Sequence, residues 1–185
     1  MLPPSSRYIP DYIDEAYEVA LLSTIDGSTW LGDLRRRVQH YGFRYDYRAR
    51  RVTVDSCLGP LPDWLAVMAD RLRKDGIFHQ QPDQVIVNEY LPGQGIASHV
   101  DCEPCFGETI ASLSLGSTCL MEFTHIDCGR SLTHTLAPRS MLVLSGEARF
   151  NWSHGIPARK SDVIEGKKVP RRRRVSLTFR TVTVR

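Results

Sequence analysis

The residues of this sequence best suited to chemistry are a histidine and an aspartate two positions apart, His99 and Asp101. In an extended backbone, residues i and i+2 point to the same side, so both side chains can reach one metal ion. A third ligand has to come from elsewhere in the chain, and His154 is the best candidate. Two histidines and a carboxylate are typical of the facial triad of non-haem Fe(II) oxygenases, which leaves positions for a co-substrate and O2.

Other interpretations of the same residues remain open. His-x-Asp also occurs on strands that simply carry two polar residues toward solvent. His125 or His134 could take the place of His154, because each lies in or beside a β-rich segment. Two histidines and an aspartate can also hold zinc. The triad therefore predicts a metal centre without naming the metal.

The last strand-like segment alternates strictly, which separates its side chains into two faces. Val175, Leu177 and Phe179 share an apolar face, and Arg174 and Arg180 share the opposite one. Arginine binds carboxylates through paired N–H groups and stays charged, so this second face suits an anion. The two arginines lie roughly 20 Å apart along an extended strand, so their side chains would have to converge on a small ligand.

A second pair of polar residues could assist the arginines. Asn88 and Tyr90 share a face of another predicted strand and can donate hydrogen bonds to carboxylate oxygens. We expect the neighbouring Arg171, Arg172 and Arg173, in contrast, to form a solvated basic run.

A Tyr- and Arg-rich stretch between the two predicted helices is a candidate lid over a nucleic-acid base. Tyr45 and Tyr47 could stack on the base, while Arg48 and Arg50 could meet phosphate. Glu103, close to the His-x-Asp pair, could contact a base edge. The alternative is a solvated hairpin whose tyrosines pack on the protein body, with Glu103 as a surface carboxylate.

The elements that must position these residues are mostly short strands. Helical periodicity predicts helices over 14–25 and 62–76, and β-rich segments between turn signals cover 84–90, 109–115, 118–123, 131–136, 140–144 and 174–184. We expect an α+β, mainly β fold: a double-stranded β-helix (jelly roll) with N-terminal helices packed on one sheet. Residues 1–185 would form one domain, with a helical extension over 1–37, a candidate nucleotide-recognition lid over 38–60, a jelly-roll core over 84–184 and a mobile loop over 160–170.

Composition limits the class of protein. The 185 residues are 42% hydrophobic and 24% charged with a net charge of +3, which fits a globular protein and permits nucleic-acid binding. No secretory signal or membrane span is visible, so we expect a soluble, cytoplasmic monomer with no membrane partner. The five cysteines are expected to be free thiols, although Cys102 and Cys105 could be a zinc half-site or a redox-sensitive pair.

Taken in chain order over residues 38–183, these motifs resemble the AlkB family of dioxygenases. The likeness is greatest to the dioxygenase domain of the branch that hydroxylates a modified wobble uridine in tRNA, through Tyr41–Tyr47, Pro92–Ile96 and Gly146–Phe150. The shared motifs are Asn88-x-Tyr90, Pro92-Gly93, His99-x-Asp101, Ser112–Gly116, His154-Gly155 and the Arg-x5-Arg pattern of Arg174 and Arg180.

The resemblance implies a jelly roll that holds Fe(II) through His99, Asp101 and His154. It implies that 2-oxoglutarate is bound by Asn88, Tyr90, Arg174 and Arg180, with Arg174 and Tyr90 at the distal carboxylate. Such an enzyme consumes O2, converts 2-oxoglutarate to succinate and CO2, and oxidises an alkyl group on a nucleic-acid base. We expect oxidative dealkylation of alkylated DNA or RNA. The alternatives are side-chain hydroxylation of a wobble uridine in tRNA, nucleic-acid binding without catalysis, and oxidation of a protein or small molecule.

Overall fold

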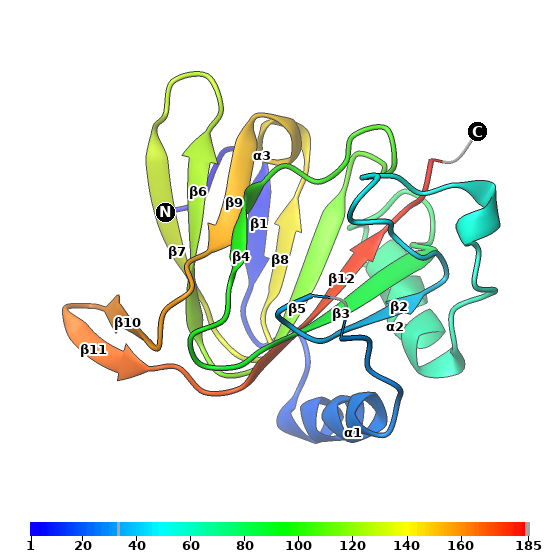
Figure 1. The fold of residues 1–185 in the computed structure, drawn as a ribbon, viewed down its shortest axis with the longest axis horizontal. Coiled ribbons are helices and arrows are strands. Elements are labelled where there is room, and N and C mark those ends of the chain that lie inside the picture. Colours follow the sequence, from blue (N-terminus) through cyan, green and yellow to red (C-terminus); the bar gives the residue numbers. More distant parts are fainter. Residues whose placement is uncertain (33, 184–185) are drawn as a thin grey trace.

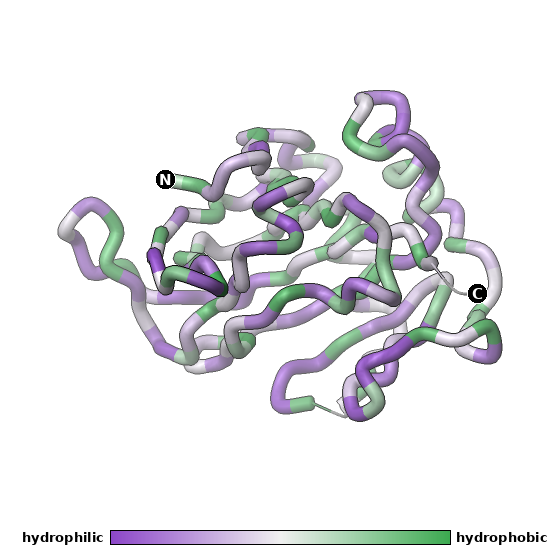
Figure 2. The backbone as a smooth tube through the Cα atoms, turned by 90° about the horizontal axis from the view of Figure 1, so that it is seen from above, coloured by the Kyte–Doolittle hydropathy of each residue, from purple (hydrophilic) through white to green (hydrophobic). Residues whose placement is uncertain are grey.

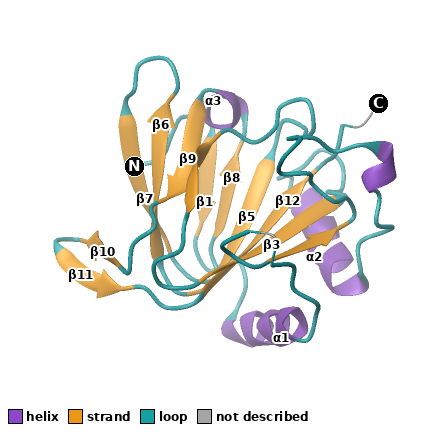
Figure 3. Cartoon of the chain, in the orientation of Figure 1, coloured by secondary structure: helices purple, strands orange, loops and turns teal. Residues whose placement is uncertain are grey.

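The computed structural model of the chain describes residues 1–32 and 34–183. Two antiparallel sheets face each other (Figure 1), one with the strand order β1-β8-β5-β12-β3-β2 and the other with the order β4-β9-β6-β7. Buried side chains from both sheets, among them Phe123, Leu142 and Trp152, fill the space between them. This is the predicted double-stranded β-helix, and Figure 3 shows how little of it is helical.

The predicted elements are present with small shifts at their ends. The larger sheet is formed by β1 (Ser6–Ile9), β2 (Val38–Tyr41), β3 (Gln84–Tyr90), β5 (Ile110–Gly116), β8 (Met141–Leu144) and β12 (Arg174–Arg180). The smaller sheet is formed by β4 (Ile96–His99), β6 (Cys119–His125), β7 (Ser131–Leu136) and β9 (Trp152–Ile156). The helices are α1 (Glu15–Asp26), α2 (Asp63–Lys74) and α3 (Gly146–Phe150), with a 3-10 turn at Val54–Ser56 and a hairpin of β10 (Ser161–Ile164) and β11 (Lys167–Pro170). The last strand was predicted to extend to Val184, which lies outside the described residues, but β12 ends at Arg180.

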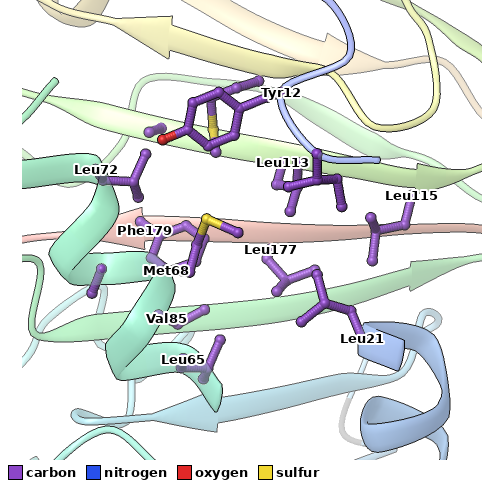
Figure 4. Close-up of a cluster of buried hydrophobic side chains, with 14 of the residues drawn as sticks. Tyr12, Leu21, Leu65, Met68, Leu72, Val85, Leu113, Leu115, Leu177 and Phe179 are labelled. Carbon is purple, nitrogen blue, oxygen red and sulfur yellow. The ribbon is translucent and has the colours of Figure 1, made fainter. Parts of the chain in front are cut away.

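Helices α1 and α2 cover the outer face of the larger sheet, as predicted. In α2, Leu65, Met68 and Leu72 recur at helical spacing and pack over Leu177 and Phe179 of β12 (Figure 4). The Asp14 side chain caps α1 by accepting a hydrogen bond from the backbone N–H of Tyr17 at 2.8 Å. Within the described residues, no helix combines the length and the apolar character needed to span a bilayer.

Strand β12 lies at the centre of the larger sheet and is buried on both faces. Its neighbours are β3, which aligns Arg174 with Tyr90 and Ser176 with Asn88, and β5, which aligns Ser176 with Ser114. The apolar residues of β12 meet the helices, and its arginines face the interior between the sheets. Figure 2 shows the same alternation more widely, because hydrophobic and hydrophilic residues follow one another along the backbone instead of forming separate blocks.

Two predictions for polar stretches were wrong. Residues 1–37 are not purely helical, because Ser6–Ile9 forms β1 and pairs with β8. Residues 160–170 are a hairpin that projects from one end of the molecule (Figure 1), not an unstructured loop. Asp162 at its base is buried and accepts hydrogen bonds at 2.7 Å from both Arg159 and Arg171. The polar residues that suggested a mobile loop therefore include a buried ion-pair network that holds the hairpin in place.

The predictions for the basic run and for the cysteines also need correction. Arg171 is buried against Asp162, and Arg173 pairs with Glu89 and Asp26, so only Arg172 is exposed as expected.

Cys102 and Cys105 form a disulfide, because a turn brings their Cα atoms within 5.3 Å, while Cys57, Cys119 and Cys128 are free thiols. This pairing contradicts the predicted free thiols at 102 and 105 and the alternative of a zinc half-site.

Candidate metal centre and co-substrate pocket

Three side chains that are distant in sequence meet at one end of the smaller sheet. His99 ends β4 and is aligned across the ladder with His154 of β9, and Asp101 lies two residues beyond β4, at the start of the segment 101–107 that contains the next turn. One ligand atom from each of the three lies within 4.8 Å of the others. His154 Nε2 is 3.5 Å from Asp101 Oδ2. Asp101 lies just outside the strand, whereas the pair was predicted from the alternation within one strand.

The two alternative histidines lie elsewhere. His125 packs edge-on against Trp152 with 5.2 Å between ring centroids, and its Nδ1 accepts the backbone N–H of Asp127. His134 packs edge-on against Tyr8 at 4.4 Å. Within the described residues, neither of them joins the cluster of potential ligands.

The protonation states of the histidines suit a metal ion. His99 Nδ1 lies 2.8 Å from the carbonyl oxygen of Ala97, which can only accept, so Nδ1 donates this hydrogen bond and Nε2 is the nitrogen left to bind a metal. Burial lowers the pKa of His154 to about 4, and this effect outweighs the opposing attraction of Asp101. The His154 imidazole is therefore neutral near pH 7 and able to coordinate a metal ion.

The Asp101 carboxylate is ionised and its two oxygens have different surroundings. Burial opposes its ionisation, but the positive charge of the nearby Arg180 holds the pKa of Asp101 well below its usual range. Arg180 donates to Oδ1 from Nε at 3.0 Å and from Nη2 at 2.6 Å. Oδ2 is buried, accepts no hydrogen bond from the described residues and faces His154. A free carboxylate oxygen beside two imidazole nitrogens fits a divalent cation.

A narrow pocket between the sheets continues from this cluster and contains an unpaired cation. Arg174 is 3% exposed, and its Nη2 donates to Ser114 Oγ at 2.8 Å. Its Nε and Nη1 are buried and have no partner among the described residues. The guanidinium carbon lies 5.3 Å from the centre of the Tyr90 ring. A buried guanidinium with two unpartnered donor nitrogens fits a carboxylate ligand.

The other predicted co-substrate residues line the same pocket. Asn88 and Tyr90 are buried on β3 beside Arg174, as the register requires, and Arg180 also contributes to the wall. Asn88 Oδ1 accepts a hydrogen bond from Arg36 Nε at 2.9 Å. Sequence analysis missed Arg36, because it lies in a run of three arginines without periodicity. Ser114 was included in the Ser112–Gly116 motif but was given no role, although the alternation of Ser112 and Ser114 along β5 places both on one face.

A second, wider cavity of about 330 Å³ opens on the other side of the triad. Tyr45, Tyr47 and Arg50 of the predicted lid line it, whereas Arg48 and Glu103 are exposed and do not. The two tyrosines pack edge-to-face with 5.1 Å between ring centroids. The Tyr47 hydroxyl is buried without a partner among the described residues, and burial raises its pKa. The cavity therefore combines aromatic walls, a free hydrogen-bonding group and cations next to the triad.

The sequence is similar to a known protein family and to several known proteins. Residues 19–180 match the 2OG-Fe(II) oxygenase superfamily. The chain is 37% identical over 202 residues to the alkylated DNA repair protein ALKBH8 homolog of Arabidopsis thaliana, covering 97% of this chain and 58% of that protein. It is 36% identical over 178 residues to the tRNA (carboxymethyluridine(34)-5-O)-methyltransferase ALKBH8 of Macaca fascicularis, covering 90% of this chain and 26% of that protein. The chain thus spans little more than half of one relative and about a quarter of the other.

The fold itself also recurs in a solved structure. The structure of OsALKBH1 superimposes with a TM-score of 0.74 and 19% sequence identity, covering 98% of both chains. At this identity the likeness concerns the fold, which agrees with the two facing antiparallel sheets described above.

Proposed function

Because the chain belongs to the 2OG-Fe(II) oxygenase superfamily, whose members use Fe(II), 2-oxoglutarate and O2, we propose that it dealkylates alkylated bases in DNA or RNA. The observation that carries the proposal is the wide cavity next to the triad. It is bounded by His99 and Asp101 on one side and by Tyr45, Tyr47 and Arg50 on another. Its volume of about 330 Å³ lies at the small end of the usual range for small-molecule sites, about 300–1,000 Å³.

In this proposal the triad and the narrow pocket hold the cofactor and the co-substrate. His99, Asp101 and His154 would bind Fe(II), and Arg174, with Tyr90 and Asn88, would bind 2-oxoglutarate. When bound, these groups supply the oxidation of an alkyl C–H bond by O2, with 2-oxoglutarate leaving as succinate and CO2. Arg180 occupies Asp101 Oδ1 and so leaves Oδ2 for the metal. The buried charge of Arg174 would neutralise the distal carboxylate of the co-substrate.

The lid residues would receive the base. A base cannot reach a buried metal without leaving its stack, so it has to be turned out of the strand into the cavity. Tyr45 and Tyr47 offer ring faces and the free Tyr47 hydroxyl offers a hydrogen bond. Arg50 and Arg36 bring positive charge to the same cavity, where the phosphate backbone would pass. The name of the Arabidopsis relative, an alkylated DNA repair protein homolog, supports this substrate class.

A second candidate is hydroxylation of a modified wobble uridine in tRNA. It is supported by the similarity to the Macaca protein, which is named as a methyltransferase acting on carboxymethyluridine 34 of tRNA. The two candidates differ in the atom that bears the oxidised carbon. An alkyl group on a ring nitrogen is lost as an aldehyde after hydroxylation, whereas a side chain on a ring carbon keeps its hydroxyl group.

Product analysis with matched substrates tests the proposal. Succinate and aldehyde would be measured with oligonucleotides carrying N-methylated bases, with the same oligonucleotides unmodified, and with tRNA carrying carboxymethyl-modified uridine. We expect equal amounts of succinate and formaldehyde from the methylated strands and no product from an Asp101→Asn variant. Hydroxylated uridine without aldehyde would favour the second candidate. Iron binding with no stimulation of succinate by any nucleic acid would reject both.

A further inference from the structure

A buried arginine outside the predicted site contacts the turn that carries Asp101. Arg149, in α3, is 2% exposed. Among the described residues, its guanidinium donates hydrogen bonds only to backbone carbonyl oxygens of this turn. No acidic side chain among them forms an ion pair with it. The acceptors are the carbonyls of Asp101 (2.9 Å, from Nη1), Cys102 (3.4 Å, from Nη2), Phe106 (3.5 Å, from Nη2) and Gly107 (3.3 Å, from Nε).

The position of Arg149 in the chain connects two members of the triad. It lies five residues before His154, in the short helix that leads into β9. Through its hydrogen bonds this helix is attached to the turn that leaves β4 after His99. The helix is itself fixed to the strand, because Trp152 Nε1 donates to Glu147 Oε1 at 3.2 Å. The guanidinium thus joins the segment of His154 to the segment of Asp101.

The bond to the Asp101 carbonyl sets the direction of the side chain. A hydrogen bond to this oxygen fixes the plane of the peptide after Asp101, and this plane limits where the carboxylate can point. The far end of the turn has other anchors, since Gly107 N–H donates to Thr181 and Thr183 N–H donates to Cys105, both at 2.9 Å. Arg180 then holds one oxygen of the side chain. Backbone and carboxylate of Asp101 are therefore fixed by two different arginines.

We propose that Arg149 is a positioning residue of the metal centre, which holds Asp101 in place by binding the carbonyl groups of its turn. The proposal rests on the metal centre of the proposed function and is independent of which substrate is oxidised. Four carbonyl acceptors compensate a cation that burial would otherwise disfavour. A purely structural arginine would need no link to a metal-binding residue, whereas this one bonds to the backbone carbonyl of Asp101.

Metal affinity in matched variants tests the proposal. In the full chain, the dissociation constant for Mn(II), which replaces Fe(II) without reacting with air, would be measured for Arg149→Met and Arg149→Lys. Thermal unfolding of the metal-free protein would be recorded alongside. The control is Arg171→Met, which removes another buried arginine whose partner, Asp162, lies in the β10–β11 hairpin.

We expect Arg149→Met to weaken Mn(II) binding about ten- to a hundredfold, the range for residues that orient metal ligands. Arg149→Lys should lose less, because its ammonium can still donate to some of the carbonyls. Arg171→Met should lower the unfolding temperature and leave Mn(II) affinity unchanged. Wild-type Mn(II) affinity in either folded Arg149 variant would overturn the proposal, whatever the change in unfolding temperature. If Arg149→Met does not fold, Arg149→Lys decides. A wild-type protein that binds Mn(II) but oxidises no nucleic acid would reject the proposed function alone.

Discussion

Replacing Arg174 by methionine should weaken 2-oxoglutarate binding. The same substitution should leave the free energy of unfolding of the ligand-free protein unchanged or raise it. Arg174 is 3% exposed, and of its N–H groups only Nη2 has a partner, the Ser114 hydroxyl at 2.8 Å. Its Nε and Nη1 have none among the described residues. The fold therefore carries an uncompensated buried cation, and a bound carboxylate would compensate it.

The two effects can be given magnitudes. Truncating one partner of a buried, hydrogen-bonded charge pair costs about 2–5 kcal/mol of binding, which corresponds to roughly 30-fold to several thousand-fold weaker 2-oxoglutarate. In the ligand-free protein, exchanging buried charge for apolar volume is neutral or stabilises by about 1–4 kcal/mol. Methionine has a flexible side chain of similar length and can fill the space left by the guanidinium stem.

Titration calorimetry of 2-oxoglutarate into Mn(II)-loaded protein would measure the first effect, and urea unfolding of the metal-free protein the second. The matched control is Arg171→Met, because Arg171 is also buried but donates to both oxygens of Asp162 at 2.7 Å. Its loss should cost about 3–5 kcal/mol of stability and leave 2-oxoglutarate affinity unchanged. If Arg174→Met binds 2-oxoglutarate like the wild type, or is destabilised as much as Arg171→Met, the assignment of Arg174 is refuted.

Three further predictions concern other parts of the molecule. Burial opposes the ionisation of Asp162, but hydrogen bonds from Arg171 and Arg159 outweigh it and lower the pKa of this carboxyl group. Asp162 should therefore stabilise the fold above the usual Asp pKa of about 4 and lose that contribution as the pH falls. Urea unfolding measured across this pH range should show a weaker pH dependence for Asp162→Asn than for the wild type. Tyr45→Ala should weaken nucleic-acid binding by about 1–3 kcal/mol, the usual contribution of one stacked base, with 2-oxoglutarate affinity intact, and an unchanged KM for the oligonucleotide would remove Tyr45 from the substrate site. His154→Ala should weaken Mn(II) binding by more than about a hundredfold, beyond the range for residues that only orient ligands, and a wild-type titration curve would exclude His154 from the triad.

The parts of the fold that the sequence could predict are those with a local pattern. Strand β12 was placed with the correct start and the correct faces, because its alternation of apolar and polar residues reflects burial on two different surfaces. Helix α2 followed from the spacing of Leu65, Met68 and Leu72. The composition of the triad was also predicted, and the structure brings its three members together. Asp101, however, lies beyond the end of β4, where its backbone carbonyl accepts a hydrogen bond from Arg149, and the pattern gave no sign of this contact.

What the sequence could not predict depends on partners far away in the chain. Strand β1 pairs with β8, more than a hundred residues later, and nothing in Ser6–Ile9 alone indicates this. Arg36 reaches the site only because its segment runs beside β3, where it donates to Asn88. The hairpin of β10 and β11 looked unstructured, because the buried pair of Asp162 and Arg171 is polar in composition. In each case a non-local contact determines a conformation that local propensity leaves open.

Four arginines are buried among the described residues, and they differ in their partners. A buried guanidinium has to be compensated, and the nature of its partner shows what it is for. Arg171 has the carboxylate of Asp162, far from the triad, and Arg180 has Asp101, whose second oxygen accepts no hydrogen bond from the described residues. Among the same residues, Arg149 donates only to backbone carbonyls and Arg174 to one hydroxyl group. Arg174 and Arg180 share one face of one strand, so alternation treats them alike, but of the two only Arg174 has no anionic partner among the described residues. This difference is why the proposed function gives the carboxylate of the co-substrate to Arg174 and the orientation of Asp101 to Arg180.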